Sequence, residues 1–480
     1  MRRGEVMRSF VERGMCSAVA VLAIALVGLT PRQAFSEWSV GEPIVTYWGD
    51  HDQSYVTGDR SVRGGYNLNW ASNMAEVGLA DKFGLRTRLR GDYNGSVSLG
   101  GLLEPDTLDD PVRKAALDDL IAEYKTHPSA YAYYITDEPT SKAEIDSWIP
   151  LVTYLQQEDP DRVNIIEMGA PSWVEKTQFG GEPGIWQHYI DVLHPKLLMY
   201  DYFNLEKRDP ATGVLDKDGD PHDEADYLSN LQFVAGLAKA NNIPFMNAVQ
   251  AIVWEDHWRL PTQDEMYFLV YSTLAYGAQG ISYFNYYQNN IPEAEGGIQF
   301  NPDGTPTAIY TTLQTLNPEF SKVATELQSV KWIGAYLKGY HPLALPPDTE
   351  VLPAASPFDI ASVTNTLGYQ WGDPLQEVLI GLFSPDGTTV GGATVALVEN
   401  LNYSSFKIYT LTGPGDLSIF DATTGLWTPT GSNQAILNLH PGRGVLVRLT
   451  EAAASTVPEP STLALLALAL GVVSLRRSRS

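Results

Sequence analysis

The stretch that decides the fold is Asp110–Pro139, which reads DPVRKAALDDLIAEYKTHPSAYAYYITDEP. Asp110 and Pro111 begin a predicted helix, because aspartate caps free backbone N–H groups and proline suits the first helical position. The predicted apolar face of that helix comprises Val112, Ala116, Leu120 and Tyr124, with Leu117 and Ile121 alongside. A β-type run, Ala130–Thr136, follows and stops before Asp137-Glu138-Pro139. A helix leading directly into a buried strand is the repeating unit of α/β folds.

The same alternation extends in both directions from this unit, over residues 37–335. Thr262 and Glu265 form a capping box ahead of one of the later helices. Eight strands alternating with helices predict an α/β fold, specifically a (β/α)8 TIM barrel. The eight predicted strands are Ile44–Trp48, Tyr66–Trp70, Leu85–Arg90, Ala130–Thr136, Val163–Glu167, Leu197–Phe203, Ile243–Ala251 and Ile281–Tyr286.

Beyond the barrel the sequence changes character. Residues 336–370 form a proline-rich linker and sandwich entry, and residues 371–452 carry short strands separated by turn residues. Glu377–Phe383 and Thr394–Glu399 flank the turn Ser384-Pro385-Asp386-Gly387, which predicts a hairpin. We expect a small antiparallel β-sandwich domain in this part of the chain.

Residues 1–36 have the three parts of a secretory signal peptide. Arginines come first, an apolar run extends from Ala18 to Leu29, and Ala34 and Ser36 provide the small residues of a cleavage site. The apolar run is shorter than the ~20 residues that a membrane-spanning helix needs, which argues against a membrane anchor. We therefore predict cleavage near Ser36 and export of the mature chain.

Residues 457–480 combine Val457-Pro458-Glu459-Pro460, an uncharged run from Ser461 to Leu475, and a closing arginine cluster. This order resembles the PEP-CTERM sorting tag of Gram-negative bacteria. The resemblance implies an exosortase-type processing protease as a partner and delivery to the cell surface or extracellular matrix. Membrane contact is expected only through this tag before processing, with its basic end on the cytoplasmic side. An ordinary C-terminal anchor, the alternative, would leave the body on the same side of the membrane.

The composition narrows the classes of partner. The net charge of −25 repels nucleic acid and anionic membranes, so neither is expected to bind the body of the protein. Cys16, the only cysteine, lies in the predicted signal peptide, so the mature chain would have no disulfide. No His or Cys cluster has metal-ligand spacing and no glycine-rich phosphate loop occurs, so neither a metal nor a cofactor is predicted. An aspartate-rich loop at residues 216–220 lacks the Gly and Glu that an EF-hand needs.

Active sites of (β/α)8 barrels form at the carboxyl-terminal ends of the strands. The predicted strands end in carboxylates, amides and aromatic rings. Carboxylates suit proton transfer to a leaving oxygen, and flat rings suit the apolar faces of sugars. The expected substrate is therefore a carbohydrate, and the predicted substrate-binding residues are Trp48, Asp50, Trp70, Arg90, Tyr134, Tyr202, Gln250, Trp254, Asn285 and Tyr286.

Asp137 and Glu138, followed by Pro139, are the strongest candidates for catalysis. Proline cannot continue the strand, so the two acids would be held at the barrel mouth. Burial among aromatic rings would raise the pKa of Glu138, as a general acid requires. The alternative is that the two acids only cap a helix that begins near Ser141.

Asp137-Glu138-Pro139 resembles the Asn-Glu-Pro of clan A glycoside hydrolases, in which the Glu is the acid/base. Met199–Phe203 (MYDYF) and Leu274–Phe284 are similar to stretches of barrel glycosidase-like bacterial proteins, and the nearest named group is the β-galactosidase-like hydrolases related to family 42. The resemblance implies a glycosidase barrel. It fails at one position, because clan A retaining enzymes place a nucleophilic Glu at the end of strand seven, where this chain has Gln250. Glu255 lies five residues further on.

Three hypotheses remain for the site. In the first, Glu138 is the acid and Asp201 or Glu167 is the base or nucleophile, with a separation of roughly 5–5.5 Å for retention and ~6.5–9.5 Å for inversion. In the second, Asp137 and Glu138 act together in substrate-assisted catalysis, which resembles family 123 hexosaminidases and needs a twist at Pro139. In the third, the site binds glycan without cleaving it. The leading prediction is an extracellular glycoside hydrolase of poly- or oligosaccharides, and the alternative is a non-catalytic surface glycan-binding or matrix protein.

Overall fold

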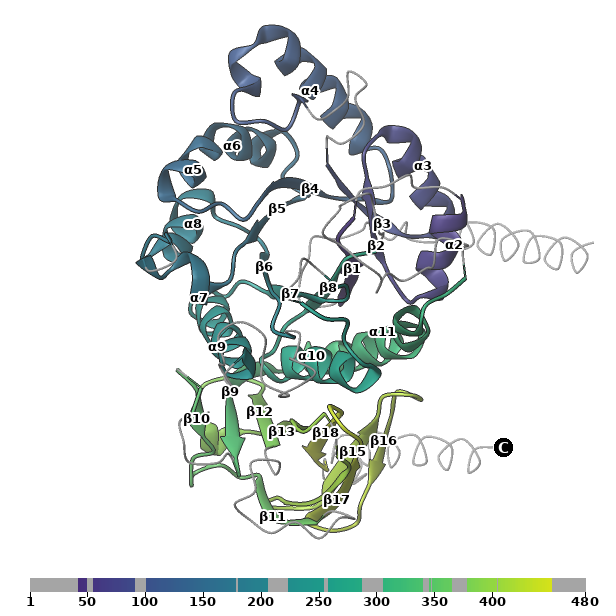
Figure 1. Ribbon diagram of the computed structural model, residues 1–480, viewed down its shortest axis with the longest axis vertical. Helices are drawn as coiled ribbons and strands as arrows, with labels where there is room; N and C mark the ends of the chain where they lie inside the picture. The colour runs from purple at the N-terminus through teal and green to yellow at the C-terminus, as the bar shows by residue number, and fades with distance from the viewer. Residues whose placement is uncertain are drawn as a thin grey trace, which may run out of the picture.

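The computed structural model describes residues 42–49, 55–90, 101–177, 180–205, 223–253, 258–286, 305–339, 345–346, 348–364, 378–403 and 405–450. Within these ranges, eight parallel strands form a nearly closed barrel surrounded by helices (Figure 1). Antiparallel sheets follow the barrel in the chain and lie beside it. The predicted fold class, a (β/α)8 barrel followed by an antiparallel β domain, is confirmed.

The barrel strands are hydrogen-bonded in the order β1-β8-β7-β6-β5-β4-β3-β2. The ring closes between β1 and β2, where the N–H of Asn67 donates to the carbonyl of Val45 and Thr46 Oγ1 donates to the carbonyl of Leu68. Each strand overlaps its predicted run, with ends that differ by at most two residues. The strands are β1 (Ile44–Tyr47), β2 (Leu68–Ala71), β3 (Arg86–Leu89), β4 (Ala130–Asp137), β5 (Val163–Met168), β6 (Leu198–Tyr202), β7 (Phe245–Gln250) and β8 (Gly280–Phe284).

Helices cover the outside of the ring (Figure 1). Helix α10 begins with the predicted capping box, in which Thr262 and Glu265 each bond the other's backbone N–H. The helices are α2 (Tyr55–Arg63), α3 (Met74–Phe83), α4 (Pro111–Tyr124, after the short 3-10 turn η2, Thr107–Asp109), α5 (Lys142–Ser147), α6 (Ile149–Glu158), α7 (Pro171–Val174), α8 (Ile185–Leu193), α9 (Asp223–Asn241), α10 (Gln263–Ala275) and α11 (Ala308–Leu327).

Helix α4 begins where the sequence predicts, but its buried face differs in part. Asp110 Oδ1 accepts a hydrogen bond from the N–H of Val112 at 2.8 Å, which caps the helix. The Val112 side chain itself is 78% exposed, so its predicted place on the apolar face is wrong. The side chains that pack inward follow the i, i+3, i+4, i+7 pattern of one helical stripe, and Val112, five residues before Leu117, lies about 140° around the helix from that residue. They are Leu117, Leu120, Ile121 and Tyr124.

The second domain consists of a seven-stranded and a three-stranded sheet, in the orders β10-β9-β12-β13-β18-β15-β16 and β11-β14-β17. The predicted hairpin is confirmed, because β12 pairs antiparallel with β13. Strand β9 also pairs with β12, so the predicted boundary at residue 335 falls inside a strand of this domain. The strands are β9 (Lys331–Lys338), β10 (Glu350–Val351), β11 (Asp359–Thr364), β12 (Val378–Ser384), β13 (Val395–Asn400), β14 (Lys407–Thr412), β15 (Leu417–Asp421), β16 (Leu426–Pro429), β17 (Gln434–Leu439) and β18 (Gly444–Leu449).

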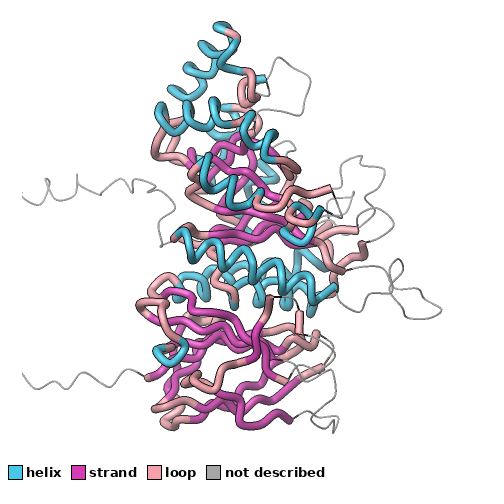
Figure 2. The backbone as a smooth tube through the Cα atoms, turned by 90° about the vertical axis from the view of Figure 1, so that its left-hand side faces the viewer, coloured by secondary structure: helices cyan, strands magenta, loops and turns pink. Residues whose placement is uncertain are grey.

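Helix α10 separates the barrel from the second domain (Figures 1 and 2). Every residue from Glu265 to Ala275 is buried, as expected of a helix covered on all sides. Gly381 of β12 allows a close approach, because a Cβ atom there would lie 2.2 Å from the Ala275 carbonyl oxygen. The second domain therefore packs against the flank of the barrel and leaves the ends of the strands to the barrel's own segments.

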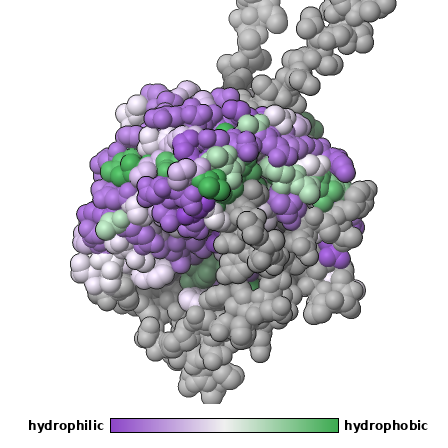
Figure 3. Space-filling model, turned by 90° about the horizontal axis from the view of Figure 1, so that it is seen from above, coloured by the Kyte–Doolittle hydropathy of each residue, from purple (hydrophilic) through white to green (hydrophobic). Residues whose placement is uncertain are grey.

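Few large apolar side chains of the described residues are exposed. Hydrophilic side chains dominate the described part of the face seen in Figure 3, with small separate hydrophobic areas between them. Among the described residues, no helix combines the length and the apolar character that crossing a membrane requires.

Candidate active site

A cavity of about 620 Å³ opens where the barrel strands end. This volume lies within the ~300–1,000 Å³ range of small-molecule sites. Its walls combine carboxyl groups with aromatic rings. The lining residues are Trp48, Asp137, Glu138, Glu167, Ala170, Trp173, Asp201, Tyr202, Phe203, Trp258 and Phe284. All four predicted catalytic carboxyl groups are therefore brought together.

Asp137 ends β4 and Glu138 follows it, and both line the cavity. Adjacent residues of a regular strand point to opposite faces, so this arrangement needs a change in backbone direction. Glu138 provides the change: its φ is +44°, in the left-handed region that costs a non-glycine residue about 1–2 kcal/mol. The Glu138 N–H donates to the carbonyl oxygen of Glu167 at 2.7 Å, which ties the bend to β5. The twist therefore lies at Glu138, one residue before Pro139.

Tyr134 joins Asp137 to Glu167. Its hydroxyl oxygen lies 2.9 Å from Asp137 Oδ1 and 2.9 Å from Glu167 Oε2. A phenol donates only one proton, so both contacts are hydrogen bonds only when one of the two carboxyl groups is itself protonated. Burial, and then the charge of Asp137, raises the pKa of Glu167 to about 8. Glu167, which is 2% exposed, is therefore the carboxyl that holds this proton at neutral pH.

Glu138 and Asp201 form a second carboxyl pair, from β4 and β6. Their side chains share a hydrogen bond, which requires a proton on one of them. Burial, and then the charge of Asp137, raises the pKa of Glu138 to about 7. Burial, and then Glu138, raises the pKa of Asp201 well above its ordinary range. Asp201 therefore holds the shared proton most firmly and donates it to the Glu138 carboxylate.

Two arginines balance the remaining charge. Glu167 and Asp201 hold protons and Glu138 is protonated in about half of the molecules at pH 7, so the four carboxyl groups carry between one and two negative charges. Arg88 is fully buried, with its guanidinium carbon 3.9 Å from the centre of the Trp70 ring and Nη2 donating to the Tyr47 carbonyl at 2.5 Å. Burial lowers the pKa of Arg88 to about 10, which leaves it charged at neutral pH. Arg90, always cationic in proteins, lies 5.7 Å from the centre of the Trp48 ring. The cluster is therefore close to neutral overall.

A continuous row of aromatic rings lines the rest of the cavity. The ring centres of Trp48 and Phe284 are 5.4 Å apart, those of Phe284 and Phe203 are 4.9 Å apart, and those of Phe203 and Trp258 are 6.0 Å apart. Trp258 Nε1 donates to the Phe203 carbonyl at 3.2 Å, which fixes the indole in place. Flat apolar faces next to carboxyl groups suit the C–H faces and hydroxyl groups of a sugar.

Several predicted substrate-binding residues lie behind the cavity wall. Each of them is at most 2% exposed and none lines the cavity; they are Trp70, Tyr134, Gln250, Asn285 and Tyr286. Side-chain alternation turns Asn285 away from the face of Phe284, and Tyr286, beyond the end of β8, stacks on Tyr47 with ring centres 4.2 Å apart. Trp70 and Arg90 support Trp48 from behind, with the Trp48 and Trp70 ring centres 5.8 Å apart. Trp48 and Tyr202 do line the cavity.

Gln250 uses its amide for structure. Oε1 accepts a hydrogen bond from the N–H of Leu205 at 3.0 Å, and Nε2 donates to the carbonyls of Leu205 and Arg259 at 3.1 and 2.5 Å. The side chain thus ties the segment after β6 to the segment after β7. Two other predicted residues, Asp50 and Trp254, lie outside the described residues, as do Glu255 and the aspartate-rich loop at 216–220.

Sequence reasoning did not single out Trp173, Phe203 or Phe284. Phe203 and Phe284 lie at or near the ends of predicted strands, so the rule that site residues follow the strand ends covers them. The prediction nevertheless names their neighbours Tyr202, Asn285 and Tyr286. Trp173 follows β5 by five residues, in the short helix α7, and a strand-end rule does not reach that far.

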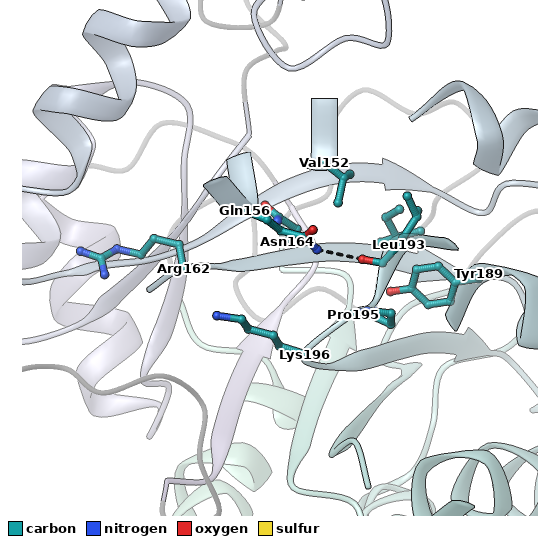
Figure 4. Close-up of a pocket in the computed structure, with 9 residues that line it drawn as sticks. Val152, Gln156, Arg162, Asn164, Tyr189, Leu193, Pro195 and Lys196 are labelled. Carbon is teal, nitrogen blue, oxygen red and sulfur yellow. Dashed lines mark hydrogen bonds between the residues drawn. The ribbon is translucent and has the colours of Figure 1, made fainter. Parts of the chain in front are cut away.

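The cavity drawn in Figure 4 is too small to hold a substrate. It lies at the amino-terminal end of β5, where Gln156 Nε2 donates to the Leu193 carbonyl at 2.8 Å and Asn164 and Tyr189 are close by. Its volume of about 10 Å³ is at the lower limit for holding one water molecule. In the described part of the chain, no group of three or more His, Cys, Asp or Glu side chains could hold a metal ion.

The fold is similar to that of solved glycoside hydrolases. A family 42 β-galactosidase from G. stearothermophilus aligns with a TM-score of 0.48 at 7% identity, covering 86% of this chain and 99% of the other. A family 39 glycoside hydrolase from Bacteroides cellulosilyticus WH2 aligns with a TM-score of 0.45 at 12% identity, covering 85% and 81%. A family 27 β-L-arabinopyranosidase from Geobacillus stearothermophilus aligns with a TM-score of 0.44 at 9% identity, covering 88% and 98%. At these identities the similarity concerns the fold alone.

No curated protein sequence matches the chain. Residues 456–479 match the family model of the PEP-CTERM protein-sorting motif. The match confirms the predicted C-terminal tag, and the motif implies exosortase-mediated sorting to the cell surface.

Proposed function

We propose that this protein is an exported glycoside hydrolase that cleaves poly- or oligosaccharides with Glu138 as its general acid. The observation that carries the proposal is the placement of the Glu138 carboxyl group in the cavity. The backbone of Glu138 is in the left-handed region, and the pKa of its side chain is raised to about 7. A carboxyl with that pKa is protonated in about half of the molecules at neutral pH, ready to protonate a leaving oxygen. Backbone strain at a residue of this kind is typical of functional sites.

The separation of the carboxyl groups bears on the mechanism. Two-carboxylate mechanisms need roughly 5–5.5 Å for retention or ~6.5–9.5 Å for inversion. Burial and the neighbouring carboxyl groups raise the pKa of Asp201 well above its ordinary range, so Asp201 stays protonated at neutral pH and does not supply a second carboxylate. Glu167 Oε2 is engaged by Tyr134. The geometry favours the paired use of Asp137 and Glu138, whose side chains share the cavity.

In this mechanism the proton moves from Glu138 to the glycosidic oxygen as the bond between that oxygen and the anomeric carbon breaks. Asp137 orients the substrate group that stabilises the positive charge developing at the anomeric carbon. Water then displaces this substrate group at the anomeric carbon and gives a proton to the Glu138 carboxylate, which restores the acid for the next turnover.

The second candidate is a non-catalytic surface protein that keeps the barrel for glycan binding or matrix architecture. The observation in its favour is Gln250, which stands where a retaining clan A hydrolase has its nucleophile. Its amide is fully committed to the backbone of Leu205 and Arg259. An amide held in this way cannot form a glycosyl-enzyme bond.

Export and sorting would place the protein at the same location under either proposed function. The C-terminal motif supports an exosortase-type protease as processing partner and a place at the cell surface or in the extracellular matrix. The net charge of −25 argues against nucleic acid as a partner. A polysaccharide outside the cell is therefore the proposed substrate.

The test compares the wild type with Glu138→Gln on aryl glycosides whose leaving groups range from dinitrophenol to simple alcohols. Loss of a general acid should lower kcat/KM by ~10²–10⁴-fold on poor leaving groups and much less on dinitrophenyl glycosides, which need no proton. Glu158→Gln, on the exposed end of α6, is the matched control and should cleave like the wild type. A wild type that binds polysaccharide but cleaves no glycoside would support the second candidate.

A further inference from the structure

Trp173 differs from the other rings of the cavity in its exposure. It lies in α7, close after the β5 strand that supplies Glu167, and 41% of its surface is exposed. The other lining rings, those of Trp48, Tyr202, Phe203, Trp258 and Phe284, are all half-buried. Single exposed apolar side chains are common, and Val112 is one of them. Trp173 is set apart because it lines the cavity that contains the carboxyl groups.

The backbone around Trp173 is held from several sides. The N–H of Ser172 donates to Asn230 Oδ1 at 2.7 Å, and Asn230 Nδ2 donates to Ser172 Oγ at 2.9 Å, which fastens α7 to α9. A Cβ atom at Gly169 would lie 2.7 Å from Val174 Cγ1 and 3.2 Å from Trp173 Cε3, so this turn has no room for a side chain. The ring is therefore presented on a fixed support, and binding a ligand would cost little ordering.

The cavity is larger than one sugar ring requires. Its volume of about 620 Å³ corresponds to about twenty liquid waters of ~30 Å³ each, whereas a hexose has about twelve non-hydrogen atoms. One ring next to Glu138 therefore leaves part of this volume unfilled, in a cavity that Trp173 also lines. An exposed indole face with an N–H at its edge suits the apolar face and a hydroxyl group of a second ring.

We propose that Trp173 is the platform of a second sugar subsite, so that the site takes a chain of at least two sugar units. This inference rests on the proposed carbohydrate function and deepens it by naming the residue that binds a second sugar unit. The aromatic row and the carboxyl groups bind the unit at the cleaved bond, and Trp173 binds a neighbouring unit.

The first arm of the test is kinetic and uses the full exported chain. Trp173→Ala should lower kcat/KM roughly tenfold on oligosaccharides of two to five units, mostly through KM, and leave aryl glycosides of one sugar within about twofold. Trp173→Phe should recover most of the loss. Trp427→Ala, in β16 of the second domain, is the control for removing a half-buried tryptophan far from the cavity. An equal loss on short and long substrates, or no loss on long ones, would overturn the subsite.

The second arm is binding and does not depend on cleavage. Calorimetric titration of Glu138→Gln, with and without Trp173→Ala, uses ladders of gluco-, galacto-, xylo- and chito-oligosaccharides. Affinity should rise with chain length only when Trp173 is present, and failure to bind any ladder would refute the proposal. Trp173-dependent binding without cleavage would leave the subsite standing and refute the catalytic function. Cleavage that Trp173→Ala leaves unchanged would support the catalytic function and refute the subsite.

Discussion

Replacing Glu167 by glutamine tests the protonation pattern of the carboxyl cluster. Glu167 is 2% exposed, lies 2.9 Å from the Tyr134 hydroxyl, and has a pKa raised from 4.5 to about 8, first by burial and then by Asp137. Glutamine has the same shape, can donate a hydrogen bond to the phenol oxygen as the protonated carboxyl does, and cannot ionise. The variant therefore removes the titration of this one group with little change in packing.

The sign and size of the effect follow from linkage. A folded-state pKa above the unfolded value gives stability that is complete below the unfolded pKa and is lost as the pH rises through the folded pKa. For Glu167 the window runs from about 4.5 to about 8. At 1.36 kcal/mol per pKa unit, the shift is worth about 5 kcal/mol, of which about 4 falls between pH 5 and pH 9.

The assay is urea unfolding of both proteins, followed by tryptophan fluorescence, at pH 5, 7 and 9. The wild type should lose stability with rising pH, and Glu167→Gln should lose about 2–4 kcal/mol less over the same range. Glu158→Gln, an exposed carboxyl on α6, should keep the wild-type slope. Parallel curves for the wild type and Glu167→Gln would refute the assignment of a proton to Glu167.

Three further perturbations test other parts of the structure. Tyr134→Phe removes the hydroxyl shared by Asp137 and Glu167, so it should destabilise the protein by about 1–3 kcal/mol in urea unfolding and raise the pKa of Asp137, seen as a shift in the pH–rate profile. Glu399→Gln, in the interface between the domains, replaces a fully buried carboxyl that accepts from Ser272 Oγ at 2.9 Å and whose pKa burial raises; thermal unfolding should show a gain in stability at pH 9 and little change at pH 5. Gln250→Glu turns a double donor into an acceptor facing the carbonyls of Leu205 and Arg259, so it should cost about 2–4 kcal/mol and restore no nucleophile; a stable, more active variant would contradict this account of Gln250.

The barrel could be predicted from the sequence because its signals are local. Each buried strand is a short β-type run, and Asp110 and Thr262 form the N-terminal caps of α4 and α10. In the second domain the strength of the signal varies. Strand β17 alternates exposed and buried positions throughout, whereas β10 has two exposed residues and carries no pattern at all. The pairing of β9 with β12 depends on contacts between distant segments, which spacing alone does not reveal.

The site could be predicted only to the level of which strand ends contribute. The carboxyl groups of β4, β5 and β6 do meet in one cavity. Which of two neighbouring side chains faces that cavity depends on the path of the backbone after the strand, as Phe284 and Asn285 show. The left-handed φ of Glu138 has no counterpart in the local sequence, because Glu is not a residue that favours this region. Trp173 was missed because its position is set by α7 and Asn230, not by a strand.

The departure from the clan A pattern at β4 and the departure at β7 can be explained together. In a two-carboxylate hydrolase the negative charge of the second carboxylate helps to keep the general acid protonated. Here β7 supplies a neutral amide, but the residue before the acid is Asp137 where the resembling motif has Asn. Asp137 is the largest contributor after burial to the raised pKa of Glu138, and it is itself held by Tyr134. In the proposed mechanism the charge that keeps Glu138 protonated therefore comes from the neighbouring residue Asp137, and both carboxyl groups line the same cavity.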